Sequence, residues 1–438
     1  MDKNLEKKLD ELKFTNYINT NPVMQIDGKP IYVEDLVKAG LIGKLNTFIV
    51  GESGEGKTQI EKDVMALAGN KATFILGRDD MDVRALFTTM GTDIKKVKTL
   101  AELRQFTEKL GYNIFVVDEL TRCLPQVQNN LFNLFDGIVE VDGTECELGD
   151  GFSVGLASGN VGNGKYFGAH KTERGLNDRM HLFFDIDNIP TLPEDDFEID
   201  TKYKDPRVKN SKGKDRMNIV KDLHEQVKEE DISLIPYVMA WYFKKGLDYI
   251  PNFPGESKRK IKDVWPNLDL SKLGTHEKGS DYNLIFPMSK RSGLSALELT
   301  RALSLIAKAK GAKDINYKDL ILDVFKVTLP YQGILNPAKV DTNFYGNPYL
   351  AMEGIIQGIE GELRYKPSGS DLTRIVAIEE AISLAQKGKL DDKLNQDYFD
   401  NRWKFMPRIL EKISKNYKGA KWAIHFMIQR EGFIWGQV

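Results

Sequence analysis

The chain has 438 residues, a length that corresponds to roughly two to four domains of ordinary size. Its residues are 41% hydrophobic, which is enough for packed cores, so we expect a folded globular protein. Sixty-two Lys and Arg against 64 Asp and Glu leave a formal net charge of −2. This balance excludes a chain-wide attraction to nucleic acid or anionic membrane, and any such partner would have to bind a local patch.

The cysteine content and the N-terminal sequence favour the cytoplasm. Cys123 and Cys146 are the only two cysteines, so a disulfide framework is not indicated and a reducing compartment is expected. The N-terminal stretch MDKNLEKKLDELKF lacks the apolar segment of a secretory signal, and no segment approaches the ~20 apolar residues that cross a bilayer. We therefore expect a soluble cytoplasmic protein with no membrane partner.

Taken in chain order, the sequence predicts five parts. Residues 1–44 form a lead-in with a short charged helix and a hairpin-like turn at Asp27-Gly28. Between residues 45 and 190, apolar strands (NTFIV, ATFIL, NIFVVD, FSVGLAS, MHLFFDI) alternate with helical patterns, which predicts an α/β core with a parallel sheet flanked by helices. Residues 191–290 read as an enlarged linker with helices, 291–335 as a helical lid, and 336–438 as a mostly helical C-terminal extension.

A phosphate-binding loop follows the first strand of this core. The sequence GESGEGKT matches the pattern GxxxxGK[ST] between a strand and a helix, which is the context that this motif requires. The loop N–H groups surround the β-phosphate, Lys57 reaches the β and γ oxygens, and the Thr58 hydroxyl is a ligand of Mg²⁺. The predicted nucleotide contacts are Gly51, Glu52, Ser53, Gly54, Glu55, Gly56, Lys57, Thr58 and Gln59. The alternative, a glycine-rich turn with a chance lysine, does not account for the order of strand, loop and helix.

Two carboxylates, Asp118 and Glu119, lie at the end of the strand predicted over residues 113–118. Buried acids destabilise a fold unless a cation meets them, and Mg²⁺ supplies that charge. We assign Asp118 to the metal and Glu119 to polarising the attacking water. Acids at a strand end also cap helices, but that interpretation is weak beside a matched phosphate loop. ATP and Mg²⁺ are thus the predicted cofactors, with hydrolysis to ADP and phosphate as the reaction.

The stretch VVDELTRCLPQVQNNLFNLFDGIVEVDG resembles a segment of the MoxR branch of AAA+ ATPases, a lineage shared with dynein, midasin and the minichromosome helicases. That family has Asp-Glu-Ile-Asn-Arg, then a helix and an acidic hairpin; here Thr121 replaces the Asn. Residues 125–135 carry a helical apolar stripe, and residues 139–148 alternate around Asp142-Gly143. A second family insert would fall at residues 86–97. The resemblance implies an AAA+ P-loop core followed by a helical lid.

The resemblance also implies a water-orienting sensor and an arginine finger. Residues 152–160 resemble a family strand that ends in Ala-Thr-x-Asn, which makes Asn160 the sensor, although an Asn can also cap a glycine-rich turn. Residues 173–180 resemble Leu-x-x-Ala-x-x-Asp-Arg-Phe, whose arginine reaches the ATP of the neighbouring subunit. Arg179 is the candidate finger, Arg174 competes with it, and an ordinary surface ion pair is the alternative role for Arg179.

A third residue is implied for the lid. Ser289-Lys290-Arg291 opens a predicted helix and resembles the family's Ser-Pro-Arg, so Arg291 is the candidate second sensor on the γ-phosphate. Lys290 stands where the family has proline, and it could share or take this role.

The leading functional hypothesis is a MoxR-like ring motor, a homo-hexamer that remodels a protein client. In that family the clients often carry von Willebrand A domains. The alternative is a nucleic-acid translocase, which would use the basic run between residues 202 and 216, but the neutral charge and the acidic hairpin argue against it. A nucleotide-gated ring with little turnover is a third possibility. No cysteine or histidine spacing indicates zinc.

Overall fold

The computed structural model describes residues 3–69, 71–78, 111–141, 144–160, 172, 174–203, 205–210, 213–233, 235–245 and 288–365. The expected insert at 86–97, the Asp142-Gly143 turn, much of the predicted linker and the end of the C-terminal extension lie outside these ranges. The chain divides into two compact units. The first is formed by Met1–Asp231 and Leu294–Gly333, the second by Ile232–Gly293 and Ile334–Val438.

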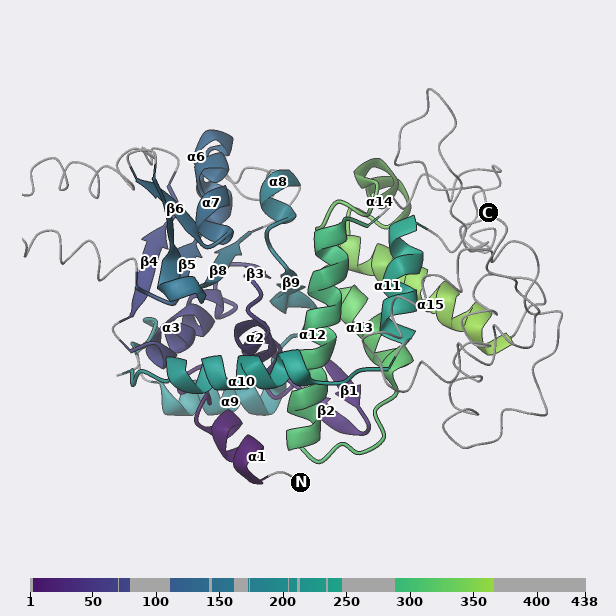
Figure 1. Cartoon of the computed structure of the whole chain (residues 1–438), viewed down its shortest axis with the longest axis horizontal. Coiled ribbons are helices and arrows are strands. Elements are labelled where there is room, and N and C mark those ends of the chain that lie inside the picture. Colours follow the sequence, from purple (N-terminus) through teal and green to yellow (C-terminus); the bar gives the residue numbers. More distant parts are fainter. Residues whose placement is uncertain are drawn as a thin grey trace, which may run out of the picture. The chain divides into compact units, whose positions relative to one another are not determined.

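A parallel sheet lies in the first unit (Figure 1). Its strands follow the order β4-β5-β8-β3-β9, and every neighbouring pair is parallel. The strands are β3 (Thr47–Val50), β4 (Ala72–Leu76), β5 (Ile114–Asp118), β8 (Val154–Gly159) and β9 (Leu182–Asp185). Each strand expected between residues 45 and 190 is thereby confirmed, and so is their parallel pairing.

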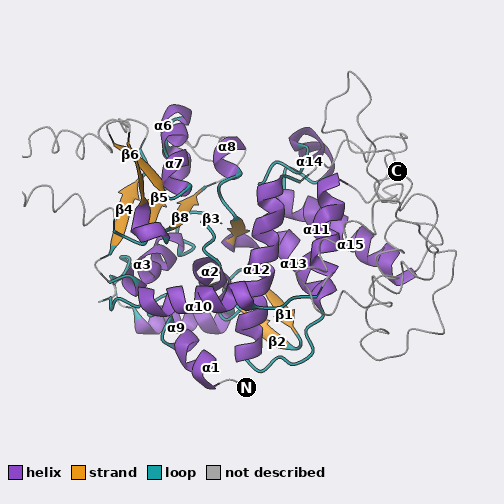
Figure 2. Cartoon of the chain, viewed as in Figure 1, coloured by secondary structure: helices purple, strands orange, loops and turns teal. Residues whose placement is uncertain are grey.

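Helices surround this sheet, as the strands in orange and helices in purple of Figure 2 show. On one face, Phe48, Phe115 and Phe183 join a buried apolar cluster that includes Phe135 from the segment after β5. The ring centroids of Phe115 and Phe135 are 5.1 Å apart. Because side chains alternate along a strand, the residues directly before and after each of the three strand phenylalanines point to the opposite face of the sheet. The helix α3 (Lys57–Leu67) packs against β5 and β8.

The helix predicted over residues 125–135 is present with a break. Its two parts are α6 (Pro125–Asn130) and α7 (Phe132–Phe135), with Leu131 between them, and Pro125 occupies the first turn as expected. The hairpin predicted after it is confirmed as the antiparallel pair β6 (Ile138–Val141) and β7 (Thr144–Glu147). The short helix α8 (Arg174–Asn177) precedes β9.

The remaining elements of the first unit are mostly helical. The charged N-terminal helix is α1 (Lys3–Asp10), and the expected Asp27-Gly28 turn joins β1 (Met24–Ile26) to β2 (Lys29–Ile31). Further helices are α2 (Val33–Ile42), α9 (Pro193–Lys202), α10 (Met217–Glu229) and α13 (Tyr317–Thr328). The short 3-10 turns are η1 (Leu120–Arg122), η2 (Leu148–Gly151) and η3 (Ile186–Asn188).

The second unit is helical where it is described. It contains α11 (Ile235–Lys245), α14 (Pro337–Asn343) and α15 (Pro348–Tyr365). The long helix α12 (Lys290–Ala309) begins in this unit and continues in the first. Along the described part of the chain, no helix combines the length and the apolar character needed to cross a membrane.

Candidate nucleotide site

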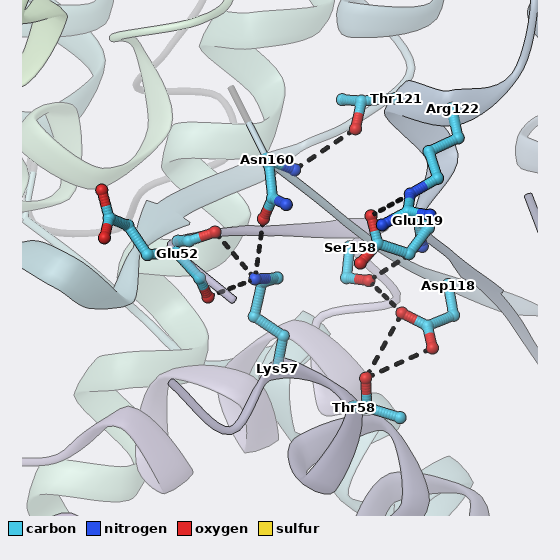
Figure 3. Close-up of polar contacts among 10 residues, drawn as sticks. Glu52, Lys57, Thr58, Asp118, Glu119, Thr121, Arg122, Ser158 and Asn160 are labelled. Carbon is cyan, nitrogen blue, oxygen red and sulfur yellow. Dashed lines mark hydrogen bonds and ion pairs between the residues drawn. The ribbon is translucent and has the colours of Figure 1, made fainter. Parts of the chain in front are cut away.

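Three polar segments meet at the carboxyl edge of the sheet because of the strand order. The strand β8 lies between β3 and β5, and all three run in the same direction. The loop that leads to Lys57 follows β3, Asp118 ends β5, and Asn160 follows β8. These residues, separated by up to about a hundred positions in sequence, therefore come together (Figure 3).

The phosphate loop needs glycine at two positions. Gly54 has φ 100° and Gly56 has φ 90°, a left-handed region that other residues rarely adopt. Gly56 is also the residue directly before α3, so the loop turns straight into the helix. Such a loop directs its backbone N–H groups inward at a positive helix end, which is the arrangement that binds a phosphate.

Lys57 is buried and fully hydrogen-bonded. Its Nζ donates to the carbonyls of Gly51 at 2.7 Å and Glu52 at 2.6 Å, and to Asn160 Oδ1 at 2.9 Å. Burial lowers the pKa of Lys57, and the nearby Glu119 carboxylate opposes that shift. The three ammonium protons all meet neutral oxygens, which are weaker acceptors than the charged oxygens of a phosphate.

The predicted metal ligands, Thr58 and Asp118, form what we call the metal corner, and Glu119 adjoins it. One hydroxyl contacts both acids. Ser158 Oγ donates to Asp118 Oδ1 at 2.6 Å and accepts the Glu119 N–H at 3.2 Å. Thr58 Oγ1 donates to Asp118 Oδ2 at 3.2 Å. We did not predict this role for Ser158 from the sequence, although the signal was present, since it lies two residues before Asn160 on a buried strand.

Glu119 adopts a left-handed backbone conformation, with φ 58°. A non-glycine residue there is uncommon, and such residues concentrate at functional sites. Gly77 permits this turn, because its N–H donates to the Asp118 carbonyl at 2.7 Å and an added Cβ would lie 2.4 Å from the Glu119 carbonyl oxygen. The Glu119 carboxylate accepts from Arg122 Nε at 3.2 Å.

Asn160 is fixed from two sides. Its N–H donates to Thr121 Oγ1 at 3.2 Å, and its side-chain oxygen accepts from Lys57. The hydroxyl of Thr121 thus anchors the candidate sensor. Thr121 stands at the position where MoxR proteins, which this segment resembles, have Asn. An added Cβ on Gly159 would lie 2.7 Å from Thr121 Cγ2, so glycine is needed for this close approach.

Glu61 is a buried acid beside this corner. It is 0% exposed, and neither of its carboxyl oxygens makes a hydrogen bond within the described residues. Burial raises the pKa of Glu61 well above its usual range, and the adjacent Asp118 carboxylate raises it further. Nothing in the sequence pattern singled out Glu61; its i+3 spacing from Thr58 on a helix was the available signal.

We expect Glu61→Gln to raise the thermal unfolding midpoint of the nucleotide-free and metal-free protein at pH 8. Above the ordinary Glu pKa of about 4.3, the unfolded chain releases this proton while the folded protein retains it, so the wild type loses stability as the pH rises. Below that pKa both states hold the proton, and the difference should vanish. Calorimetry at pH 4, 6 and 8 measures the effect, with the exposed Glu229→Gln as control. A lower midpoint at pH 8 would contradict the prediction.

Gln59, expected at the nucleotide, is hydrogen-bonded to another segment of the chain. Its side chain donates to the Lys209 carbonyl at 3.0 Å and accepts the Lys209 N–H at 2.8 Å. On the same helix, the Asp63 carboxylate accepts the N–H groups of Asn16 at 2.9 Å and Tyr17 at 2.8 Å. Two distant segments are thus attached to α3, and no local sequence signal indicates either contact.

A second acidic pair, Asp185 and Asp187, lies at the end of β9, next to the phosphate loop. Asp187 accepts the Glu52 N–H with both carboxylate oxygens, each at 2.9 Å. Burial raises the pKa of Asp185 to about 6. Sequence reasoning missed these two residues, although acids at the end of an apolar strand are the pattern that identified Asp118 and Glu119.

The candidate finger, Arg179, forms an ion pair within its own subunit. Its Nε lies 2.7 Å from Asp136 Oδ2, and its guanidinium lies over the Phe132 ring, 4.7 Å from the centroid. The side chain of Arg174, the competing residue, lies outside the described part of the chain. The role of Arg179 at a neighbouring nucleotide stays a prediction.

Arg291 belongs to the second unit, in the first turn of α12. Ser289 caps this turn, since its Oγ accepts the Ser292 N–H at 3.0 Å. The Ser-Lys-Arg sequence therefore opens a helix as expected, and the assignments of Arg291 and Lys290 to the γ-phosphate stay predictions.

Comparison with known proteins supports the fold. Residues 46–148 match the model of the AAA domain (dynein-related subfamily). An ATPase candidate of known structure from Cytophaga hutchinsonii superposes with a TM-score of 0.53 at 14% identity, over 81% of this chain and 95% of that one. Comparison with curated proteins gives no match.

A full-length MCM homolog from Methanopyrus kandleri is more distant. Its TM-score is 0.36 at 12% identity, over 67% of this chain and 53% of that one. The domain match, the parallel sheet and the relative from Cytophaga hutchinsonii therefore support the fold. Residues 46–148 thus resemble an AAA domain, and the sheet with its flanking helices is an AAA+ α/β fold.

Proposed function

We propose that this protein hydrolyses ATP with Mg²⁺ as a subunit of a ring that remodels a protein client. The proposal rests on one observation. Three residues that follow or end neighbouring strands converge, namely Lys57, Asp118 and Asn160, and Glu119 adjoins them. These are the residue types that phosphate binding, metal binding and water activation require, at one edge of one sheet.

Nucleotide binding begins with Lys57. Phosphate oxygens compete for its ammonium with the carbonyls of Gly51 and Glu52 and with the Asn160 amide oxygen. Charge-assisted hydrogen bonds are about twice as strong as neutral ones, so the phosphates are favoured. When Lys57 turns to the phosphates, the amide of Asn160 becomes available to orient water.

The residues of the metal corner fit Mg²⁺. Thr58 and Asp118 offer oxygen atoms only, which this ion prefers, and the buried Glu61 adds a second acidic group nearby. Bound Mg²⁺ would neutralise charge on the β and γ oxygens of ATP. Ser158 holds Asp118 in place for this role, and its hydrogen bond to the Glu119 N–H fixes the neighbouring backbone.

In this proposal Glu119 is the residue that receives a proton from the attacking water. It follows the last residue of β5 directly, and its backbone has a φ of 58°. A carboxylate beside the γ-phosphate can align and polarise water without contacting the metal itself. The hydrogen bond from Arg122 holds this carboxylate in a defined position.

The client and ring parts of the proposal rest on the resemblance to MoxR proteins, which implies a hexamer and a protein client such as one with a von Willebrand A domain. Described residues of the basic run support a protein client over nucleic acid, because acids already neutralise part of it. Lys209 Nζ lies 3.4 Å from Asp205 Oδ2, and Arg207 Nε lies 3.9 Å from Asp205 Oδ1. A translocase would need such cations free for phosphates.

The test combines ATP turnover with molecular mass, each with and without ATP and Mg²⁺. We expect turnover that EDTA abolishes and a mass that rises to about six subunits when ATP binds. An inactive monomer would count against the ring. In parallel, binding to single- and double-stranded DNA is measured across a salt titration. Steep salt-sensitive binding would favour the translocase, whereas no binding would support the protein client.

A further inference from the structure

The guanidinium of Arg179 is held at two of its three nitrogens. Its Nε donates to Asp136 Oδ2 at 2.7 Å, and Nη1 donates to the Gly175 carbonyl at 3.1 Å. One face of the group lies over Phe132. Two hydrogen bonds and a ring contact fix both the direction and the plane of this side chain, which an isolated surface ion pair does not do.

The third nitrogen, Nη2, is available. Within the described residues, Nη2 makes no hydrogen bond, and the Arg179 side chain keeps 22% of its area exposed. A guanidinium presents five N–H donors in a rigid fork, so fixing Nε and one Nη1 proton leaves the Nη2 donors in a set direction. This geometry is suited to an anion that arrives from outside the subunit.

The backbone segments that carry Asp136 and Arg179 are also held together. Asn46 is 4% exposed, and its Nδ2 donates to the Phe135 carbonyl at 2.6 Å and to the Arg179 carbonyl at 3.0 Å. Asp136 follows Phe135 directly and ends α7, where its N–H donates to the Phe132 carbonyl at 3.0 Å. The spacing between Asp136 and Arg179 is therefore set by a buried side chain.

We propose that Asp136 is a positioning residue that holds the Nε edge of Arg179, so that the Nη edge is presented to the nucleotide of the neighbouring subunit. This rests on the proposed function, because it takes Arg179 as the residue that acts between subunits. Asp136 touches no nucleotide itself. Its effect is to reduce the conformational freedom that the arginine would otherwise lose at each turnover.

A double-mutant cycle tests this proposal in the full-length ring. Asp136→Ala is expected to lower kcat by about 10- to 100-fold, as loss of orientation does, with KM for ATP unchanged. Asp136→Asn keeps an oxygen that can accept from Nε, so its loss should be smaller. In an Arg179→Ala background, Asp136→Ala should lower kcat by less than twofold further, because the residue that it positions is absent.

A matched control comes from α12. Arg301 and Glu298 form an ion pair at 2.6 Å with side-chain exposures of 21% and 22%, so Glu298→Ala removes a similar contact away from the site and should leave kcat unchanged. Ring mass is measured for each variant, and Asp136→Asn serves if the alanine variant does not assemble.

The outcomes separate the two proposals. If Arg179→Ala lowers turnover while both Asp136 variants stay within twofold of wild type, the positioning role is wrong and the finger remains. Full additivity in the double mutant would also overturn it. If Arg179→Ala itself has no effect on an active ring, the finger assignment fails and the positioning role fails with it.

Discussion

Replacing Glu119 with glutamine is expected to lower ATP turnover by about 10³-fold, within the range of 10² to 10⁴ that loss of a general base produces. Glutamine keeps the shape of the side chain and cannot accept a proton from water. Lys57, Thr58 and the loop glycines are untouched, so ATP should still bind. Turnover is measured by phosphate release, and binding by calorimetry with ATP at a temperature that limits hydrolysis.

The control for this substitution is Glu225→Gln. Glu225 forms an i,i+3 ion pair with Lys228 at 2.7 Å, as Glu119 does with Arg122 at 3.2 Å, but it lies on α10 with an exposed side chain. It should leave turnover unchanged. Undiminished hydrolysis in Glu119→Gln would remove Glu119 from the proposed mechanism, whereas a joint loss of binding would show that its role is structural.

Replacing Arg179 with alanine is expected to lower ring turnover by about 10³-fold, at the lower end of the effect of an arginine finger. The positive charge that compensates the γ-phosphate would be missing from each interface. Because the finger belongs to the neighbouring subunit, the nucleotide affinity of a lone Arg179→Ala subunit should equal that of wild type. The measurements are turnover of the assembled ring and ATP binding at concentrations where the subunit is monomeric.

Mixing two inactive variants separates action within a subunit from action between subunits. A Glu119→Gln subunit retains Arg179, and an Arg179→Ala subunit retains Glu119. If the arginine acts across the interface, mixed rings contain some interfaces with both residues, and turnover should recover. No recovery in rings shown to be mixed would contradict action in trans, as would a loss of affinity in the lone Arg179→Ala subunit.

The sheet and the first half of the site could be predicted because their signals are local. Apolar strands with the right length and spacing predicted β3, β4, β5, β8 and β9, and the GKT loop placed Lys57 and Thr58 between a strand and a helix. Parallel pairing brings strand ends together at one edge, where Asp118 was expected. The assignment of Asn160 to this site came from the resemblance to MoxR proteins.

The contacts that were missed join distant segments of the chain. Arg179 pairs with Asp136, 43 positions away, and Gln59 pairs with Lys209, 150 positions away. Such contacts follow from how helices and loops pack, which periodicity does not encode. The break at Leu131 is a related case, since an apolar stripe predicts a helical segment and does not report an interruption within it.

The hydrogen bonds that join α3 to distant segments indicate how much of this chain a self-sufficient nucleotide-binding domain needs. A fragment limited to residues 45–190 would contain every motif residue up to Arg179. It would lack Asn16 and Tyr17, whose N–H groups bind Asp63, and Lys209, whose backbone binds Gln59. In this fragment, the Gln59 and Asp63 side chains of α3 would lose the hydrogen-bond partners that the longer chain supplies. The smallest piece that preserves these contacts extends from the N-terminal segment to at least Lys209, so the motif boundaries underestimate the folding unit.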